Sequence, residues 1–300
     1  MDFNDLRVKH KFLEEFKEKL KLKNNNYVDE LLEYNVFGGK FTRATLTFLT
    51  INQFKKEINE EDIFVCYLNE LIQAAFIIFD DIMDKSEIRR GKACWHVLKG
   101  YKVIKDAYFI LSCVRKLGKS EITKLFDVML IRSCLGQTHD SLSEDLLEKN
   151  ISLEDLRNIY IFDNYKLICL NKNAFYTFYY PIKLGLLHCK KEELDILPVC
   201  TLLGELHQMQ DDYINFLPDS NKSCLDVQQR KNTWFMCKYF ENSKGIHFYD
   251  EDALEIQLKS FFDEYYKEED NLISRIKNLN NYEINPIIEK CLMLLNKRKN

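Results

Sequence analysis

The sequence predicts an all-α protein, and three observations lead to this prediction. The 300 residues include only nine Gly and four Pro, and the first proline is Pro181. So few helix breakers over so long a stretch favour long helices over a fold with many turns. Apolar residues also recur at three- and four-residue spacing in nearly every segment. Because we find no internal repeat, linker or break in composition, we expect one helical domain over residues 1–300.

The expected helices follow one another along the chain. Phe12, Leu13, Phe16 and Leu20 keep helical spacing in the first segment, and Pro181 should kink or break an aromatic-rich later helix. The polar segment 218–230 is typical of a loop. The further helices are expected over residues 61–84, 103–117, 119–136, 153–187, 191–217, 252–279 and 283–298.

Composition and charge exclude several classes of function. A net charge of −4 gives no global attraction to nucleic acid or to an anionic membrane. The ten Cys are scattered singly without metal-finger spacing, which indicates reduced thiols in the cytoplasm. The N-terminal segment lacks the pattern of a signal or transit peptide. No stretch of 18 uncharged apolar residues is apparent, so we expect no membrane insertion.

Two acidic clusters are the most informative feature of the sequence. The first is Asp80, Asp81 and Asp84, and the second is Asp211, Asp212 and Asn215. Each cluster ends an apolar helical run, and side chains at i, i+1 and i+4 can share one face of a helix. Two such faces opposed across a cavity would offer the oxygen ligands that Mg²⁺ and a diphosphate need. The pair therefore indicates chemistry on a diphosphate ester.

A lone acidic cluster is usually a solvated surface patch, but the surroundings of the first cluster favour a site. Residues 71–79 before Asp80 contain one polar side chain, Gln73, and a helix that is apolar all round is buried. Arg89 and Arg90 follow, and guanidinium groups suit bidentate contact with phosphate. The segment Gly38–Lys40 with Arg43 is a weaker indication of a phosphate site at a helix start.

Taken together, these motifs resemble the farnesyl diphosphate synthase family of trans-prenyltransferases. The matching stretches include EYNVFGGKFTR, IQAAFIIFDDIMDKSEIRRGKACW, GQTHD, NKNAFYTFYYP, GELHQMQDD, DVQQRKNTW and the basic tail 297–299. They span most of the chain in the family's order, and their combination is specific where single motifs are not. The resemblance implies an antiparallel helical bundle of the class I isoprenoid synthase type, a prenyl diphosphate substrate and a homodimer.

The resemblance also implies roles for individual residues. Three Mg²⁺ ions would be held by the two clusters: Asp80, Asp81, Asp84, Asp211, Asp212 and Asn215. The groups acting on the allylic diphosphate would be Arg89, Lys172, Lys231 and Gln208. Further substrate-binding residues would be Lys40, Arg43, Gln73, Arg90, Gln137, Asp140, Tyr176 and Asp226, of which the first four match the isopentenyl diphosphate pocket. The cavity would include Ala75, Phe76 and His207.

The sequence departs from the family's pattern at several of these positions. Asn215 stands where the family has Asp, and a neutral amide is a weaker Mg²⁺ ligand. His207 stands where the family has Phe, and Ala75 where short-chain members carry a bulky aromatic that limits chain length. The other departures are Leu206, Asn173, Ala44, Cys224 and Leu225.

These departures leave three hypotheses open. The first is a class I terpene synthase that ionises farnesyl diphosphate with Mg²⁺ and converts the cation to a sesquiterpene. The second is a prenyltransferase that condenses isopentenyl diphosphate with an allylic diphosphate to farnesyl or geranylgeranyl diphosphate. Its support is that Lys40, Arg43, Gln73 and Arg90 are all retained. The third is a catalytically weak subunit that modifies a related synthase.

Overall fold

The all-α prediction is confirmed. The computed structural model describes residues 2–23, 25–147, 152–217, 225–242, 248–279 and 283–296, and one two-stranded hairpin is the only sheet in these ranges. Cys224 and the basic tail 297–299 lie outside the described residues. The chain divides into two compact units, Met1–Asp127 with Pro181–Leu194, and Val128–Tyr180 with Asp195–Asn300. The expectation of one domain over residues 1–300 stays a prediction.

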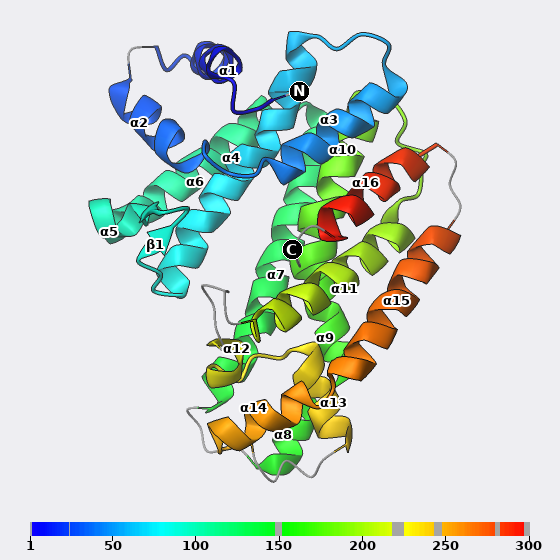
Figure 1. The fold of residues 1–300 in the computed structure, drawn as a ribbon. Coiled ribbons are helices and arrows are strands. Elements are labelled where there is room, and N and C mark those ends of the chain that lie inside the picture. Colours follow the sequence, from blue (N-terminus) through cyan, green and yellow to red (C-terminus); the bar gives the residue numbers. More distant parts are fainter. Residues whose placement is uncertain are drawn as a thin grey trace. The chain divides into compact units, whose positions relative to one another are not determined.

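The first unit is built around one long helix. This helix, α4 (Glu60–Met83), packs against α3 and α6 (Figure 1). The hairpin of β1 and β2 follows the carboxyl end of α4. The other elements are α1 (Leu6–Lys19), α2 (Asn26–Asn35), α3 (Thr42–Phe54), β1 (Ile88–Arg89), β2 (Lys92–Ala93), α5 (Trp95–Lys99), η1 (Tyr101–Val103), α6 (Ile104–Leu117) and most of α10 (Tyr180–His188).

Helix α4 is apolar enough to resemble a membrane span. By length and composition alone it could cross a membrane, which the sequence analysis did not expect, but 72% of its most apolar 18-residue window is buried inside the protein. It begins at a capping box in which Asn59 and Asp62 exchange side-chain and backbone hydrogen bonds. This degree of burial is typical of a core helix. Helix α4 therefore carries Asp80 and Asp81 at the carboxyl end of an element that is fixed in the core.

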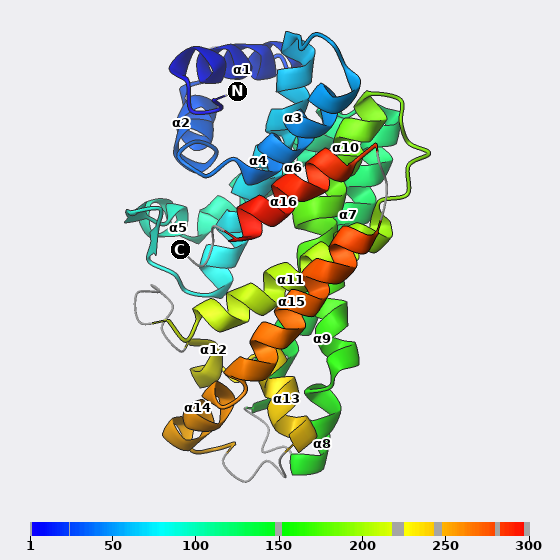
Figure 2. The same cartoon turned by 45° about the vertical axis from the view of Figure 1, so that its right-hand side comes forward.

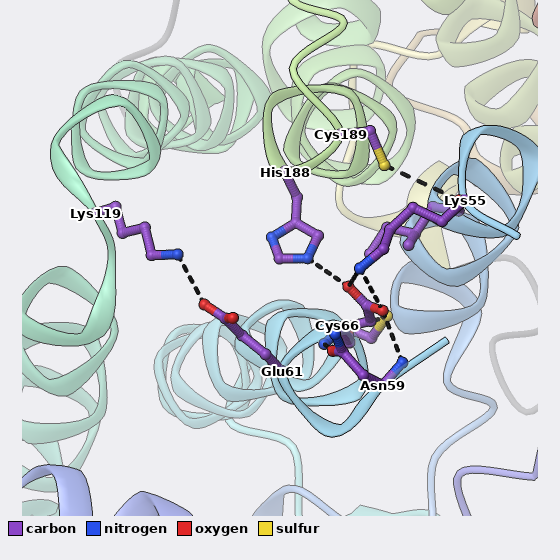
Figure 3. Close-up of polar contacts among 9 residues, drawn as sticks. Lys55, Asn59, Glu61, Cys66, Lys119, His188 and Cys189 are labelled. Atoms are coloured by element: carbon purple, nitrogen blue, oxygen red, sulfur yellow. Dashed lines mark hydrogen bonds and ion pairs between the residues drawn. The ribbon is translucent and has the colours of Figure 1, made fainter. Parts of the chain in front are cut away.

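A buried carboxylate joins three helices of the first unit (Figure 3). Asp62 is fully buried and accepts hydrogen bonds from the backbone N–H of Asn59, at 2.8 Å, and from Nζ of Lys55, at 2.6 and 2.8 Å. Nε2 of His188 lies 2.5 Å from Oδ1 of the same carboxylate. Since Lys55 ends α3 and His188 ends α10, Asp62 holds both helix ends at the start of α4.

The second unit centres on α11 (Leu197–Ile214), which packs against η2 (Cys169–Tyr179) and α15 (Phe262–Asn278). Figures 1 and 2 show α11 and α15 side by side. The remaining elements are the later part of α7 (Ser120–Leu147), α8 (Leu153–Ile159), α9 (Phe162–Ile168), α12 (Leu225–Gln228), α13 (Trp234–Asn242), α14 (Glu251–Lys259) and α16 (Asn285–Asn296).

The segment before Pro181 is a π-helix rather than a kinked α-helix. Element η2 has π-type turns, and the backbone N–H of Tyr180 bonds the carbonyl five residues back, at Phe175. Two glycines let neighbouring helices approach this element, since a Cβ at Gly136 would lie 2.5 Å from the Lys172 nitrogen and one at Gly204 would lie 2.5 Å from the Ala174 Cβ. π-Turns are frequent at functional sites, and η2 carries Lys172 and Tyr176.

Several predicted boundaries were wrong. The single helix expected over 153–187 is four elements, and the one expected over 252–279 is two helices separated near Ser260. The helix expected over 119–136 continues to Leu147 as α7. The short helix α12 lies within the segment predicted to be a loop, of which residues 218–224 are outside the described part. The helix near Asp80 begins and ends within one residue of its predicted limits.

Candidate active site

The first acidic cluster faces a guanidinium group. Nε of Arg89 donates to Oδ1 of Asp81 at 2.7 Å, and Nη2 donates to Oδ2 of Asp80 at 3.0 Å. Asp81 is buried, whereas Asp80 is partly exposed and Asp84, which caps α4, is exposed. Burial opposes the charge of Arg89, but its bonds to Asp81 and the charge of Asp80 raise its pKa above the usual value. The two carboxylates therefore share one cation, which offsets one of their two negative charges.

The hairpin that carries Arg89 also positions Arg90. Arg90 and Gly91 both have positive φ, 54° and 72°, as in the type I′ turn that suits a two-residue hairpin. Nη1 of Arg90 donates to the carbonyl oxygens of Asn35, at 3.4 Å, and Phe37, at 3.3 Å. A Cβ at Gly39 would lie 2.7 Å from Nη2 of Arg90. Gly39 therefore permits the close approach of the guanidinium to the backbone.

This arrangement forms a cationic pocket within the first unit. The pocket borders Asp81 at one side and Gly38 at another. Its remaining lining consists of cationic, aromatic and small residues: Tyr34, Asn35, Phe37, Ile77, Arg89, Arg90, Lys92, Ala93, Cys94 and Trp95. Burial and the neighbouring Asp81 raise the pKa of the Cys94 thiol to about 12, so that the thiol is neutral at physiological pH. The pocket thus offers two guanidinium groups to an anion.

Glu70 is a residue of this region that the sequence analysis missed. It is 4% exposed, and Oε1 accepts the backbone N–H of Ala44 at 3.0 Å. Burial raises the pKa of Glu70, while that N–H and the charges of Arg43 and Arg90 oppose the rise. The charge of this buried carboxylate is therefore influenced by the two arginines expected at the isopentenyl diphosphate pocket. The detectable signal was one acidic residue within the apolar run 63–79.

The other site residues predicted for the first unit lie on α4 or just before the start of α3. Gln73 is half-buried on α4, one turn after Glu70, and Lys40 is exposed beside α3. Ala75 is fully buried and Phe76 is half-buried. Their predicted roles, second-substrate binding for Lys40 and Gln73 and cavity depth for Ala75 and Phe76, stay predictions.

In the second unit, Asp212 is a buried acceptor of three hydrogen bonds. Its Oδ1 accepts Nε2 of Gln208 at 2.7 Å, and its Oδ2 accepts the Tyr165 hydroxyl and the Trp234 backbone N–H, each at 2.9 Å. Gln208 in turn accepts a hydrogen bond from Nδ2 of Asn173. Burial raises the pKa of Asp212 well above its usual value, although all three bonds oppose this. Neither Tyr165 nor Trp234 was among the predicted site residues.

The remaining residues of the second cluster are more accessible. The Asp211 side chain is 38% exposed, and its Oδ2 lies 3.3 Å from Nδ1 of His207. The His207 ring meets Phe178 edge to face, with centroids 5.9 Å apart. Asn215 is buried and donates from Nδ2 to Oδ2 of Asp226, which is half-buried on α12. The structure therefore brings Asp211, Asn215 and Asp226 to the carboxyl end of α11.

Lys172 and Asp140 form an ion pair between η2 and α7. Nζ of Lys172 contacts Oδ2 of Asp140, whose side chain is 7% exposed. Gln137 lies one turn before Asp140 and is half-buried, and Tyr176 is buried on η2. Lys231 is half-buried, and its backbone N–H donates to the Asp226 carbonyl at 2.9 Å. Of the two predicted diphosphate-binding lysines, Lys172 is therefore held on η2, and Lys231 lies between α12 and α13 with its backbone bonded to Asp226.

Comparison with known proteins shows the family of this chain. The family model for polyprenyl synthetases matches residues 25–260. The chain belongs to the polyprenyl synthetase family. Family members are prenyltransferases of the isoprenoid pathway and use divalent metal ions. The family predicted from the sequence is thereby confirmed.

Curated relatives and a solved structure agree with the family. The farnesyl pyrophosphate synthase of Saccharomyces cerevisiae is 31% identical over 70% of this chain and 65% of its own length. The human enzyme is 29% identical over 83% and 62%. The mitochondrial farnesyl pyrophosphate synthase 1 of Arabidopsis thaliana is 26% identical over 84% and 68%. The chain thus spans roughly two thirds of the length of these relatives.

The fold is also that of a solved polyprenyl synthetase. A T. brucei farnesyl diphosphate synthase complexed with a bisphosphonate superposes with a TM-score of 0.77, at 18% identity, covering 98% of this chain and 97% of the other. At that identity the likeness shows the fold alone, and it confirms the isoprenoid synthase type predicted from the sequence.

The donor sets fit a divalent cation that substrate oxygens help to bind. Within the described ranges, no three His, Cys, Asp or Glu side chains gather closely enough to form a metal site alone. Mg²⁺ commonly takes one or two carboxylates and completes its shell with phosphates and water. Asp80 and Asp81 already face one cation, the Arg89 guanidinium. They lie in the first unit and Asp211 in the second, and the expectation that the two clusters oppose each other stays a prediction.

Proposed function

We propose that this protein is a trans-prenyltransferase that condenses isopentenyl diphosphate with an allylic diphosphate. The observation that carries the proposal is the cationic pocket of the first unit, where Arg89 and Arg90 lie beside Gly38 and Asp81. Arg89 matches a contact of the allylic diphosphate and Arg90 a contact of isopentenyl diphosphate, and an enzyme that only ionises one diphosphate has no need for the second of these contacts. The names of the relatives, all farnesyl pyrophosphate synthases, favour the same reaction.

Within this proposal the chain's own residues bind and orient the two diphosphates. Arg89, Lys172 and Lys231 would contact the allylic diphosphate, and Lys40, Arg43 and Arg90 would contact the second substrate. Asp80, Asp81 and Asp211 would hold Mg²⁺, three ions in all, which neutralises the charge of the departing diphosphate. Positioned cations of this kind favour bond cleavage because they are already in place as the negative charge develops.

The terpene synthase hypothesis is the less well supported alternative. It depends on Asn215, His207 and Ala75, and the relatives reported above carry names of prenyl diphosphate synthases instead. The proposal also includes a homodimer, no membrane insertion and a cytoplasmic location. These three properties stay predictions.

The test is a product analysis with purified protein and Mg²⁺. Dimethylallyl or geranyl diphosphate with isopentenyl diphosphate should give a longer prenyl diphosphate, detected by mass spectrometry. Farnesyl diphosphate alone should give no volatile hydrocarbon by gas chromatography. A sesquiterpene in the second reaction with no elongation in the first would overturn the proposal in favour of the terpene synthase hypothesis.

A pair of variants sharpens this test. Arg90→Ala should lower the rate of condensation about 100-fold, the typical effect of removing one positioned donor at a reacting group. Arg115→Ala, in which an exposed arginine paired with Asp127 is lost, is the matched control and should retain the rate. Equal rates in both variants would remove the support that Arg90 gives to a second-substrate pocket.

A further inference from the structure

The third position of the second acidic cluster, Asn215, makes a contact that changes which carboxylates can bind a metal. Its Nδ2 donates to Oδ2 of Asp226 and to the Asp211 carbonyl oxygen. An Asp at position 215 could not donate, and its negative charge would repel Asp226 at this separation. The amide therefore permits a close approach of Asp226 that a carboxylate would oppose.

Asp212, in contrast, is poorly placed to bind a cation. Three of its roughly four lone-pair positions are occupied by Gln208, Tyr165 and Trp234. The residue is 1% exposed. Coordination at any of these three occupied positions would need a buried donor to give up its acceptor, at a cost of about 1–3 kcal/mol each. Asp212 therefore acts as a buried anchor between α11, α9 and the start of α13.

A third observation concerns the amide oxygen of Asn215. This atom is buried and has no hydrogen-bond partner among the residues that the structure describes, and the whole residue is 4% exposed. Buried acceptors are rarely left unsatisfied, and amide oxygens are ordinary ligands of hard cations. The unsatisfied oxygen belongs to the same amide that holds Asp226, so it lies within the cluster.

We infer that Asn215 is a positioning residue that brings Asp226 into the second acidic cluster, so that Asp211 and Asp226 are the carboxylates this unit offers to a divalent cation. Asp226 on α12 supplies the negative charge that an Asp at position 215 would have carried, and Asp212 has a structural role. This assignment rests on the proposed function for the identity of the substrate only, because the metal and inorganic diphosphate can be tested without turnover.

The fixed backbone of α12 supports this assignment. The Asp226 carbonyl accepts the Lys231 N–H at 2.9 Å, and the Val227 carbonyl accepts the Arg230 N–H at 3.1 Å. Asp226 thus reaches the cluster from a separate element whose turn is held by hydrogen bonds.

The experiment measures Mn²⁺ binding in the presence of inorganic diphosphate, by the electron paramagnetic resonance signal of free Mn²⁺. Asp211→Asn defines the loss that follows when the second cluster is disabled. Asp226→Asn should reproduce that loss, and Asn215→Ala should weaken binding by about 10- to 100-fold, as for other groups that orient metal ligands. Asn215→Asp should also weaken binding, because it replaces the donor by a like charge.

Asp212→Asn is the discriminating control. We expect it to lower thermal stability while the folded fraction binds Mn²⁺ within twofold of the wild type. Tyr165→Phe removes one donor to Asp212 with little change in shape, and it should also leave Mn²⁺ binding unchanged if the asparagine variant does not fold. The inference is overturned if Asp212→Asn loses Mn²⁺ as Asp211→Asn does while Asp226→Asn binds normally, or if Asn215→Asp binds Mn²⁺ more tightly.

The same measurements separate this inference from the proposed function. Failure of the wild type to elongate an allylic diphosphate, together with the expected Mn²⁺ pattern, would remove the prenyltransferase proposal and leave the assignment of Asp226 supported. If the wild type elongates an allylic diphosphate but Asp226→Asn binds Mn²⁺ normally, the prenyltransferase proposal is supported and the assignment of Asp226 is removed.

Discussion

Asp62 provides the sharpest prediction about stability. Replacement by Asn keeps the size of the side chain but removes the negative charge that Lys55, His188 and the Asn59 N–H share. The new amide would also turn an N–H₂ group toward groups that are themselves donors. We therefore expect Asp62→Asn to loosen the junction of α3, α4 and α10.

The size of the effect follows from burial. Removing one partner of a buried ion pair costs about 3–5 kcal/mol, and the lower end applies because the Lys55 side chain is 31% exposed. A loss of about 3 kcal/mol should lower the melting temperature of a 300-residue chain by about 5 °C, given about 2.1 cal/mol/K of unfolding entropy per residue.

The effect should depend on pH. Burial raises the pKa of Asp62, but its bonds from Asn59, Lys55 and His188 outweigh this and lower the pKa below its usual value. A carboxyl of this kind stabilises the fold fully above its unfolded pKa, near 4, and the contribution is lost as the pH falls through the folded pKa. The deficit of Asp62→Asn should therefore be complete at pH 7 and shrink below about pH 4.

The assay is chemical and thermal unfolding of the wild type and two variants at pH 7 and below pH 4. Glu61→Gln is the matched control, since Glu61 pairs with Lys119 at 2.7 Å but both side chains are at least half exposed. Such surface pairs contribute about 0–1 kcal/mol. The reasoning is refuted if Asp62→Asn costs less than about 1 kcal/mol, or no more than Glu61→Gln.

Two further predictions concern the acidic cluster and the π-helix. Arg89→Gln leaves Asp80 and Asp81 without their cation. The melting temperature of this variant should therefore fall in EDTA and recover with Mg²⁺, whereas that of the wild type should differ little between the two conditions. Equal Mg²⁺ responses in both proteins would contradict this prediction. Gly136→Ala would place a Cβ 2.5 Å from the backbone nitrogen of Lys172. This overpacking should lower the free energy of unfolding by about 1–3 kcal/mol and should also lower turnover. An unchanged free energy of unfolding would show that η2 can shift to accommodate the Cβ without cost.

The sequence predicted the helical class and α4 well because both depend on local periodicity and on the scarcity of breakers. It missed the hairpin of β1 and β2, since two-residue strands have no periodicity to detect. It also missed the π-turns of η2, an element that Gly136 and Gly204 approach closely from helices distant in sequence. Such tertiary contacts cannot be inferred from local pattern.

The candidate site was likewise only partly predictable from the sequence. Acidic spacing and the family resemblance selected Asp80, Arg89, Asp211 and Lys172 as candidates, whose roles stay predictions, and the resemblance gave Asp212 the same metal-binding role as Asp211. Only the structure shows that Asp212 already accepts three hydrogen bonds. Two neighbouring Asp residues of one motif can therefore differ in function when one of them faces the core.

The left-handed backbone of Arg90 has a consequence for variation of this chain. A non-glycine residue in that conformation costs about 1–2 kcal/mol, so Arg90→Gly would relieve strain in the hairpin while removing the guanidinium that contacts Asn35 and Phe37. Selection for stability alone would favour glycine at this position. The arginine at position 90 therefore makes its contacts with Asn35 and Phe37 at a conformational cost that glycine would avoid.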